Sequence, residues 1–424
     1  GVSLLIYEQP CATEKRRRRK RGKMEDPKRF AYINDLVCEG CGDCSVESNC
    51  LSVEPKETPF GRKRQINLSS CNKDFSCLNG FCPSFVTVEG ATRRKKQIPG
   101  LDAQRLTHGL PTPRLPDLDK PFNLLVTGVG GTGVVTVGAL ITMAAHLEGH
   151  GACVLDFTGF AQKFGTVLSY IRLARTPEEL HQVRIDQGAA DAVIACDAVV
   201  SSAPKASAHY RPGTQVALNL AEMPTGDIVL RRDASLDIPT RARAVASVVG
   251  AGNVTALNAN AIAETLLGDA VLANVILLGF AWQQGLVPVS QTALEQAIVL
   301  NGVAIETNQR AFAIGRTLAA APDRLPPHSP SAPAAPEPLA ALIDRRAAFL
   351  SQYQDDRYAR AYRDQLARLK TALPRDHAET LTAIAARSLF KLMAIKDEFE
   401  VARLMTSADF RAELAYGGID VLVT

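Results

Sequence analysis

The cysteines of this chain are concentrated in one stretch: seven of its ten cysteines lie between Cys38 and Cys82. The first residues lack the order of a signal peptide, because the apolar run 2–7 precedes the basic run 15–21. We therefore expect a cytoplasmic protein. Thiols stay reduced in that compartment, so closely spaced cysteines favour metal binding over disulfide bonds. The chain is expected to carry a metal-binding segment.

Three of these cysteines follow one another at intervals that suit an iron–sulfur cluster. Cys38, Cys41 and Cys44 are separated by two residues each, with glycines between them that permit tight backbone turns. Such a loop caps three corners of a cubane cluster. The fourth ligand usually comes from a distant cysteine followed by proline, as Cys82 is here. The pattern predicts a [4Fe–4S] cluster on these four thiolates, with zinc or unligated thiols as the alternatives.

The remaining cysteines of the stretch, Cys50, Cys71 and Cys77, fit a regular pattern less well. The second triplet of a two-cluster ferredoxin is stretched here to Cys71-x5-Cys77-x4-Cys82, and no internal repeat is evident. These three are candidate ligands of a second cluster with a missing or non-cysteine ligand, or of a three-iron cluster. The alternative is that they are buried apolar cysteines.

A glycine-rich turn stands between a buried-strand pattern at 123–128 and an apolar helical run at 134–147. This context aims the N–H groups of a helix N-terminus at an anion. Asp156, at the end of the next strand pattern, is placed to meet a ribose hydroxyl. Binding of NAD or FAD, binding of a phosphate or CoA-type anion, and a turn that serves packing alone all stay open. The candidate binding residues are Gly128, Gly130, Gly131 and Gly133.

Alternating strand and helix patterns predict an α/β domain with a mostly parallel sheet. A small ferredoxin-like α+β segment with strand patterns at 64–68 and 85–88 precedes it, and an all-α extension with leucines at helical spacing follows it. Two proline-rich stretches are expected to be linkers. The expected division is 1–29, the tail of an upstream domain; 30–92, the iron–sulfur segment; 93–121, a linker; 122–321, the α/β domain; 322–338, a Pro-rich linker; and 339–424, the helical extension, truncated at its end.

Hydropathy and charge argue against two kinds of partner. No uninterrupted apolar run is long enough to span a bilayer, so no membrane partner is expected. The net charge is only +4, and the basic run 15–21 is interpreted as an exposed, solvated segment rather than a nucleic-acid site. A docking surface for an acidic partner such as ferredoxin is the intermediate interpretation.

Several segments of the sequence resemble those of a known enzyme family. VCEGCGDCSVESNCLSVE and INLSSCNKDFSCLNGFCPSF look like the segment that follows the thiamine-diphosphate domain in indolepyruvate ferredoxin oxidoreductases. Four further segments resemble the gamma domain shared by 2-oxoacid:ferredoxin oxidoreductases: VTGVGGTGVVTVGALI, GFAQKFGTVLSYIRLA, NLAEMPTGDIVLRRD and NANAIAETLLGDAVLANVILLGFAWQQGLVP. The C-terminal part resembles the extension of the long fused bacterial form, so the resemblance covers nearly the whole chain.

The resemblance implies a reaction in which aryl 2-oxoacids such as indolepyruvate are oxidatively decarboxylated on thiamine diphosphate and Mg²⁺. CoA would take up the acyl group, and electrons would leave through iron–sulfur clusters to ferredoxin. It also implies an oligomer, and a thiamine-diphosphate-binding part or subunit as partner, of which residues 1–29 would be the tail.

This sequence contains no thiamine-binding motif, so no residue is predicted to be catalytic and the chain by itself is expected to be inactive. Two other hypotheses stay open. One is a stand-alone NAD or flavin oxidoreductase with a ferredoxin module, and the other is a non-catalytic fragment that packs against partner subunits.

Overall fold

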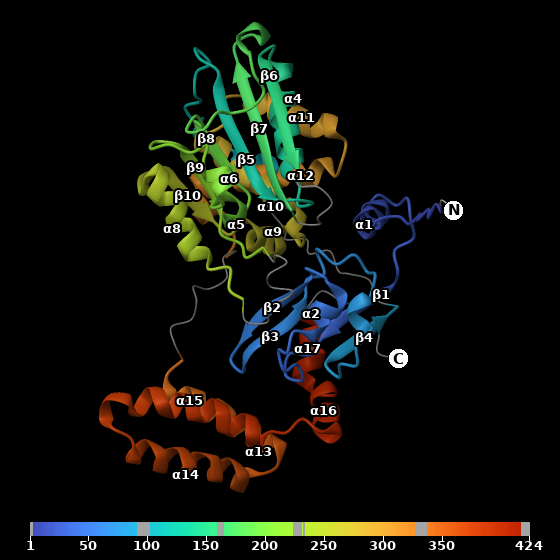
Figure 1. Ribbon diagram of the computed structural model, residues 1–424, viewed down its shortest axis with the longest axis vertical. Helices are drawn as coiled ribbons and strands as arrows, with labels where there is room; N and C mark the ends of the chain where they lie inside the picture. Colours follow the sequence, from blue (N-terminus) through green and yellow to red (C-terminus); the bar gives the residue numbers. More distant parts are fainter. Residues whose placement is uncertain are drawn as a thin grey trace. The chain divides into compact units, whose positions relative to one another are not determined.

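The computed structural model describes residues 3–90, 102–158, 165–223, 231, 234–327 and 337–416 (Figure 1). The chain divides into two compact units. The sheet unit comprises Lys95–Ile228 and Asp233–Pro330. The cysteine unit comprises Gly1–Arg94, Val229–Arg232 and Ser331–Thr424, and so combines the N-terminal cysteines with the C-terminal helices. Among the described helices, none has both the length and the apolar character needed to cross a bilayer.

The sheet unit is built on a six-stranded sheet in the order β10-β9-β8-β5-β7-β6. Its strands are β5 (Phe122–Val129), β6 (Gly151–Thr158), β7 (Thr166–Ala174), β8 (Ala192–Ala195), β9 (Gln215–Asn219) and β10 (Val254–Leu257). Strands β10, β9, β8 and β5 pair in parallel, whereas β7 pairs antiparallel with both β5 and β6. The prediction of an α/β fold with a mostly parallel sheet is confirmed, with β7 as the reversed strand among those described.

Helices cover both faces of this sheet. Successive residues of a strand point to opposite faces, so apolar residues in a row need a core on each side. In β5, Leu124 and Val126 lie in one core with residues of α4, α9, α10, α11 and α12. Leu125 lies in the other core with residues of α5, α6 and α8. The helices are α4 (Val134–Leu147), α5 (Ala198–Ser201), α6 (Pro204–Ser207), α8 (Ile238–Val249), α9 (Ala259–Leu267), α10 (Ala273–Gln283), α11 (Gln291–Asn301) and α12 (Ile305–Ala320).

The structure differs from the sequence-based expectation at the segment 93–121, which we expected to be a linker. Its described part contains α3 (Ala103–Thr107), whose Leu106 is buried in the core that also holds α12 residues. Leu118 of the same segment is buried in this core as well, and Leu115 packs against it; the many prolines and polar residues conceal these apolar anchors. Parts of both expected linkers, 93–101 and 328–336, lie outside the described residues.

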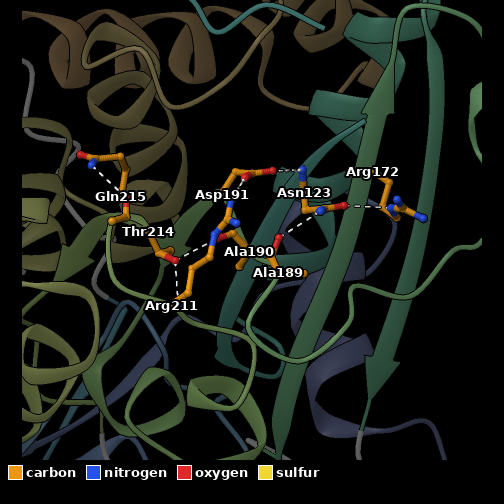
Figure 2. A network of polar contacts seen from close by, with 9 residues as sticks. Asn123, Arg172, Ala189, Ala190, Asp191, Arg211, Thr214 and Gln215 are labelled. Atoms are coloured by element: carbon orange, nitrogen blue, oxygen red, sulfur yellow. Dashed lines mark hydrogen bonds and ion pairs between the residues drawn. The ribbon is translucent and has the colours of Figure 1, made fainter. Parts of the chain in front are cut away.

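A network of polar contacts ties together the segments at the amino ends of three neighbouring strands (Figure 2). The backbone N–H of Asn123 donates to Asp191 Oδ2 at 2.9 Å, and the Asn123 side chain donates to the carbonyl of Ala189 at 3.0 Å. Arg172 Nε donates to Asn123 Oδ1 at 2.8 Å, and Arg211 forms an ion pair with Asp191. Asp191 therefore satisfies the N–H of Asn123, the second residue of β5, and holds this strand beside β8.

We expect Asp191→Ala to lower the free energy of unfolding by about 1–3 kcal/mol, because it leaves the half-buried Asn123 N–H without its acceptor. Urea unfolding followed by the emission of Trp282, the single tryptophan, measures this effect. Asp119→Ala is the matched control, since its ion pair with Arg175 is exposed on both sides and is expected to contribute less than about 1 kcal/mol. Equal losses in the two variants would contradict the role given to Asp191.

The first part of the cysteine unit consists of two antiparallel strand pairs with short helices beside them. Strand β1 pairs with β4, and β2 pairs with β3. The elements are α1 (Ala12–Lys20), β1 (Arg29–Ile33), α2 (Asp43–Ser48), β2 (Val53–Thr58), β3 (Gly61–Ile66), the 3-10 helix η1 (Ser76–Leu78) and β4 (Phe85–Glu89). The strand patterns at 64–68 and 85–88 correspond to β3 and β4.

The C-terminal part of this unit is helical where it is described, with α13 (Leu339–Tyr353), α14 (Asp356–Ala372), α15 (Arg375–Met393), α16 (Glu398–Met405) and α17 (Ala408–Tyr416). Helices α13, α14 and α15 share a small core of their own. They also contact the cysteine segment, because Phe60 packs against Phe349 and Phe390 with ring centroids 5.5 Å apart in each pair. Asn34 Nδ2 donates to the carbonyl of Leu404 at 3.2 Å. The extension thus forms part of the surroundings of the cysteines.

Candidate metal centre

Four cysteines predicted as ligands of one cluster line a single cavity of about 400 Å³ in the cysteine unit. Cys38 and Cys41 come from the loop that leads into α2, Cys44 is the second residue of α2, and Cys82 comes from the segment just before β4. The pKa of the Cys44 thiol is raised to about 11, first by burial and then by Cys38, Cys82 and Cys41. The fold therefore brings together thiols from two segments that are far apart in the sequence.

The loop around Cys38 has features that suit a metal-bound thiolate. The N–H of Gly40 donates to Cys38 Sγ at 3.3 Å, which would stabilise negative charge on the sulfur. Gly40 has φ +69°, and a Cβ at this position would lie 2.3 Å from the carbonyl oxygen of Arg62, so a side chain is excluded. The left-handed turn between Cys38 and Cys41 therefore requires glycine at position 40.

Positive charge lies next to the same cavity. Arg64 lines the cavity and is only 2% exposed. Its positive charge lowers the pKa of Cys44 and so opposes the rise caused by burial. Lys63 is also buried, and its Nζ donates to the carbonyl of Cys38 at 2.6 Å. A buried cation is costly unless negative charge accompanies it. A cluster bound by four thiolates carries such a charge, so the surroundings fit one.

The other three cysteines form a second group. The pKa of Cys77 is raised to about 12, first by burial and then by Cys50 and Cys71. The pKa of Cys71 is raised by burial, with Cys50 as a further cause. Cys77 also lines the cavity of the first group, so the two groups adjoin.

Within the described ranges, no three His, Cys, Asp or Glu side chains converge closely enough to hold a single metal ion. An iron–sulfur cluster binds each of its thiolates at a different iron, so its ligands surround a larger object. Outside the two groups, Cys196 is buried in the sheet unit, and its pKa is raised by burial; Cys153 is half-buried on β6.

The glycine-rich turn of the sheet unit follows β5 and leads into α4. A Cβ at Gly128 would lie 2.7 Å from Val134 and 2.8 Å from Cys196, so this glycine permits close packing of helix and strand. Gly131 and Gly133 have φ +84° and +104°, which favours glycine at both. The N–H of Gly130 donates to the carbonyl of Gly165 at 2.8 Å. These contacts account for the glycines through packing and backbone shape; anion binding at the turn stays a prediction.

Two carboxylates of the sheet unit are engaged with the protein itself. Asp156 on β6 accepts a hydrogen bond from Ser169 Oγ at 2.6 Å, and β7 lies between β6 and β5. Asp197, which sequence reasoning missed, follows β8 and accepts the N–H groups of Val129 and Val200 at 2.7 Å each. Burial raises the pKa of Asp197. An acidic residue directly after a buried strand was the signal that could have identified it.

Comparison with known proteins finds matches to oxidoreductases for part of this chain. Residues 123–318 match the family described as pyruvate ferredoxin/flavodoxin oxidoreductase. These residues are a domain of that family. The resemblance seen in the sequence is confirmed. Residues 339–418 of the chain match a second family, DUF6537, whose function is unknown.

The oxidoreductase domain also has named relatives. The chain is 27% identical, over 46% of its length and 95% of the relative, to indolepyruvate oxidoreductase subunit IorB of Thermococcus kodakarensis. It is 26% identical, over 46% of its length and 95% of the relative, to the same subunit of Pyrococcus horikoshii. Among solved structures, it is similar to the gamma subunit of a keto/oxoacid ferredoxin oxidoreductase from Geobacter sulfurreducens, with 21% identity, a TM-score of 0.33, and 47% of this chain and 98% of that one covered.

The cysteine segment lies before both matched family ranges, so the argument for its ligands rests on its own residues. All seven predicted ligands lie in the described part of the chain, in two groups of four and three. The predicted glycines lie together on one turn of the oxidoreductase domain, in the other unit.

Proposed function

We propose that this chain is the electron-transfer portion of a 2-oxoacid:ferredoxin oxidoreductase of the indolepyruvate type. The observation that carries the proposal is the convergence of Cys38, Cys41, Cys44 and Cys82 on one cavity, in a chain whose other unit contains an oxidoreductase domain. The named relatives of that domain are subunits of indolepyruvate oxidoreductases. A [4Fe–4S] cluster held by these four thiolates would accept and release single electrons.

The residues of the chain would determine how such a cluster behaves. The four thiolates would fix its position, and the N–H of Gly40 together with the buried Arg64 would stabilise negative charge on it. Glu39, beside Cys38, forms ion pairs with Lys391 and Lys396 of the helical extension. The extension would thereby limit the access of water to one side of the cluster.

The remaining chemistry would take place outside this chain. In the proposed enzyme, an aryl 2-oxoacid is decarboxylated at thiamine diphosphate and Mg²⁺ in a partner subunit or a further part of the polypeptide, with CoA as the acyl acceptor. Electrons would enter the cysteine unit from that centre and leave to ferredoxin. The indolepyruvate oxidoreductase relatives support this assignment because their names describe them as subunits.

The test is anaerobic expression followed by measurement of iron and sulfide and by EPR of the reduced protein. About four irons per chain are expected from the first group of cysteines, and about eight if both groups are filled. Cys41→Ala should remove at least one iron together with the EPR signal of the reduced first [4Fe–4S] cluster, because three thiolates can hold at most a three-iron cluster. Cys153→Ala, a half-buried cysteine of the sheet unit, is the control and should retain both. A protein without iron after anaerobic reconstitution would contradict the proposed function.

A further inference from the structure

The two groups of cysteines belong to two loops with the same backbone hydrogen bonds. In the first loop, the N–H of Cys38 donates to the carbonyl of Asn34 at 2.9 Å. In the second, the N–H of Cys71 donates to the carbonyl of Asn67 at 3.0 Å. Each asparagine side chain also accepts backbone N–H groups from the residues two and three positions further along its loop. The loops are therefore built alike from their first residues.

The sulfur atoms that open the two loops are held in the same way. Cys38 Sγ accepts the N–H of Gly40, and Cys71 Sγ accepts the N–H of Lys73, both at 3.3 Å. Gly40 and Lys73 occupy equivalent positions, and both have positive φ, +69° and +51°. A lysine in this conformation is uncommon. It is held by contacts of Lys73 Nζ with Asp26 at 2.7 Å and with the carbonyl of Pro27 at 2.8 Å.

The equivalence continues to the end of each loop. Gly42 and Phe75, two positions further on, have φ +86° and +59°, and each is the N-cap of a short helix, α2 or η1. Left-handed backbone at a phenylalanine costs energy, and such strain persists at functional sites where the surroundings require it. Cys44 is the second residue of α2, and Cys77 is the second residue of η1.

The segments that supply the fourth thiol are also equivalent. The N–H of Val53 donates to the carbonyl of Cys50 at 3.3 Å, and the N–H of Phe85 donates to the carbonyl of Cys82 at 3.3 Å. The N–H of Asn34 donates to the backbone carbonyl of Ser84, and the N–H of Asn67 donates to the backbone carbonyl of Ser52, both at 2.8 Å. Each loop is therefore joined to the fourth-cysteine segment of the other half, which explains why Cys82 joins the first group and Cys50 the second.

This internal repeat places Asp74 where the first loop has Cys41. The loops read Cys38-x-x-Cys41-x-x-Cys44 and Cys71-x-x-Asp74-x-x-Cys77. Cys41 and Asp74 are both exposed. Ser76 donates to Asp74 through its N–H at 3.2 Å and its Oγ at 2.9 Å, and both bonds go to Oδ1.

We propose that Cys50, Cys71, Cys77 and Asp74 bind a second [4Fe–4S] cluster, in which Asp74 ligates one iron through a carboxylate oxygen. The inference rests on the proposed function, because it assumes that the repeat holds clusters in both halves. A carboxylate oxygen is a harder ligand than a thiolate and suits iron in a sulfide cluster less well. The iron at Asp74 is therefore the one that leaves first.

Oxidation makes this difference measurable. When ferricyanide takes one electron from the second cluster, one Fe²⁺ leaves from the Asp74 corner and a [3Fe–4S] cluster remains on the three cysteines. The electron reduces ferricyanide to ferrocyanide, so electrons and irons are balanced. The oxidised three-iron cluster has a narrow EPR signal of its own, whereas the cluster with four cysteines is expected to resist this loss under the same treatment.

The test compares the wild-type chain with Asp74→Asn and Asp74→Cys after anaerobic reconstitution. Asparagine keeps an oxygen for the bonds from Ser76 but removes the anionic ligand, so iron should fall from about eight to about seven per chain. Ferricyanide should then produce the three-iron signal without any further release of iron. Cysteine completes an all-thiolate site, so about eight irons should remain and ferricyanide should produce no three-iron signal. Asp43→Asn, the same change in the first loop, should behave like the wild type.

The outcomes separate this inference from the function on which it rests. A wild-type chain without iron would overturn the proposed function. A wild-type chain with about four irons, whose signal is lost in Cys41→Ala, would leave that function standing and overturn the second cluster. Identical iron content and three-iron signals in the wild type, Asp74→Asn and Asp74→Cys would show that Asp74 is not a ligand.

Discussion

Cys82→Ala is expected to remove the same cluster as Cys41→Ala, although Cys82 stands next to Cys77 in the sequence. The fold crosses the two halves of the cysteine segment, so that Cys82 lies with Cys38, Cys41 and Cys44. We expect Cys82→Ala to lose at least one iron per chain and the same [4Fe–4S] EPR signal that Cys41→Ala loses. By the same argument, Cys50→Ala should affect the signal that Cys77→Ala affects.

The measurement is EPR of the dithionite-reduced chain together with iron determination for each single variant, and Cys11→Ala is the control because this cysteine is exposed and lies outside both groups. If the variants instead paired by sequence proximity, with Cys82→Ala matching Cys77→Ala and Cys50→Ala matching Cys44→Ala, the crossed arrangement would be wrong. The test is informative because proximity in the sequence and the crossed arrangement of the fold predict different pairs of variants.

The sequence predicted the first half of this site better than the second. Three cysteines at intervals of two residues constrain one loop so tightly that the ligands can be named without a structure. In the second loop the middle cysteine is replaced by Asp74, and the repeat is hidden when only cysteines are counted. The left-handed residues are glycines in the first loop but Lys73 and Phe75 in the second. Composition could not indicate that backbone shape.

In the sheet unit, strand and helix patterns were sufficient for the architecture but not for its exceptions. Buried strands alternating with helices predicted a mostly parallel sheet, yet β7 enters between β5 and β6 in the opposite direction. Hydrophobic periodicity does not report the direction of a strand, so it could not indicate this reversal. Hydrophobic periodicity also gives no reason for Gly279 in the apolar helix α10, whereas the structure gives it a specific role.

Gly279→Ala is expected to destabilise the sheet unit by about 3 kcal/mol. Helices α10 and α12 approach so closely that a Cβ at Gly279 would lie 2.1 Å from the carbonyl oxygen of Phe312. The contact is reciprocal, because a Cβ at Gly315 would lie 2.0 Å from the carbonyl oxygen of Ile276. Both obstacles are backbone atoms, so no side-chain rotation relieves them. Alanine favours a helix by about 1 kcal/mol over glycine, which offsets only part of this cost.

Trp282 makes the effect directly observable, since this single tryptophan lies on α10 itself, 2% exposed. Its ring centroid is 6.0 Å from that of Phe312 on α12, so its emission should report separation of this helix pair. Thermal unfolding of Gly279→Ala should occur roughly 10 °C below that of the wild type. Gly252→Ala is the matched control, because a Cβ there meets no atom within 4 Å, and a change within about 0.5 kcal/mol is expected. Equal stability of the two variants would contradict the close approach of α10 and α12, because that approach leaves no room for a side chain at Gly279.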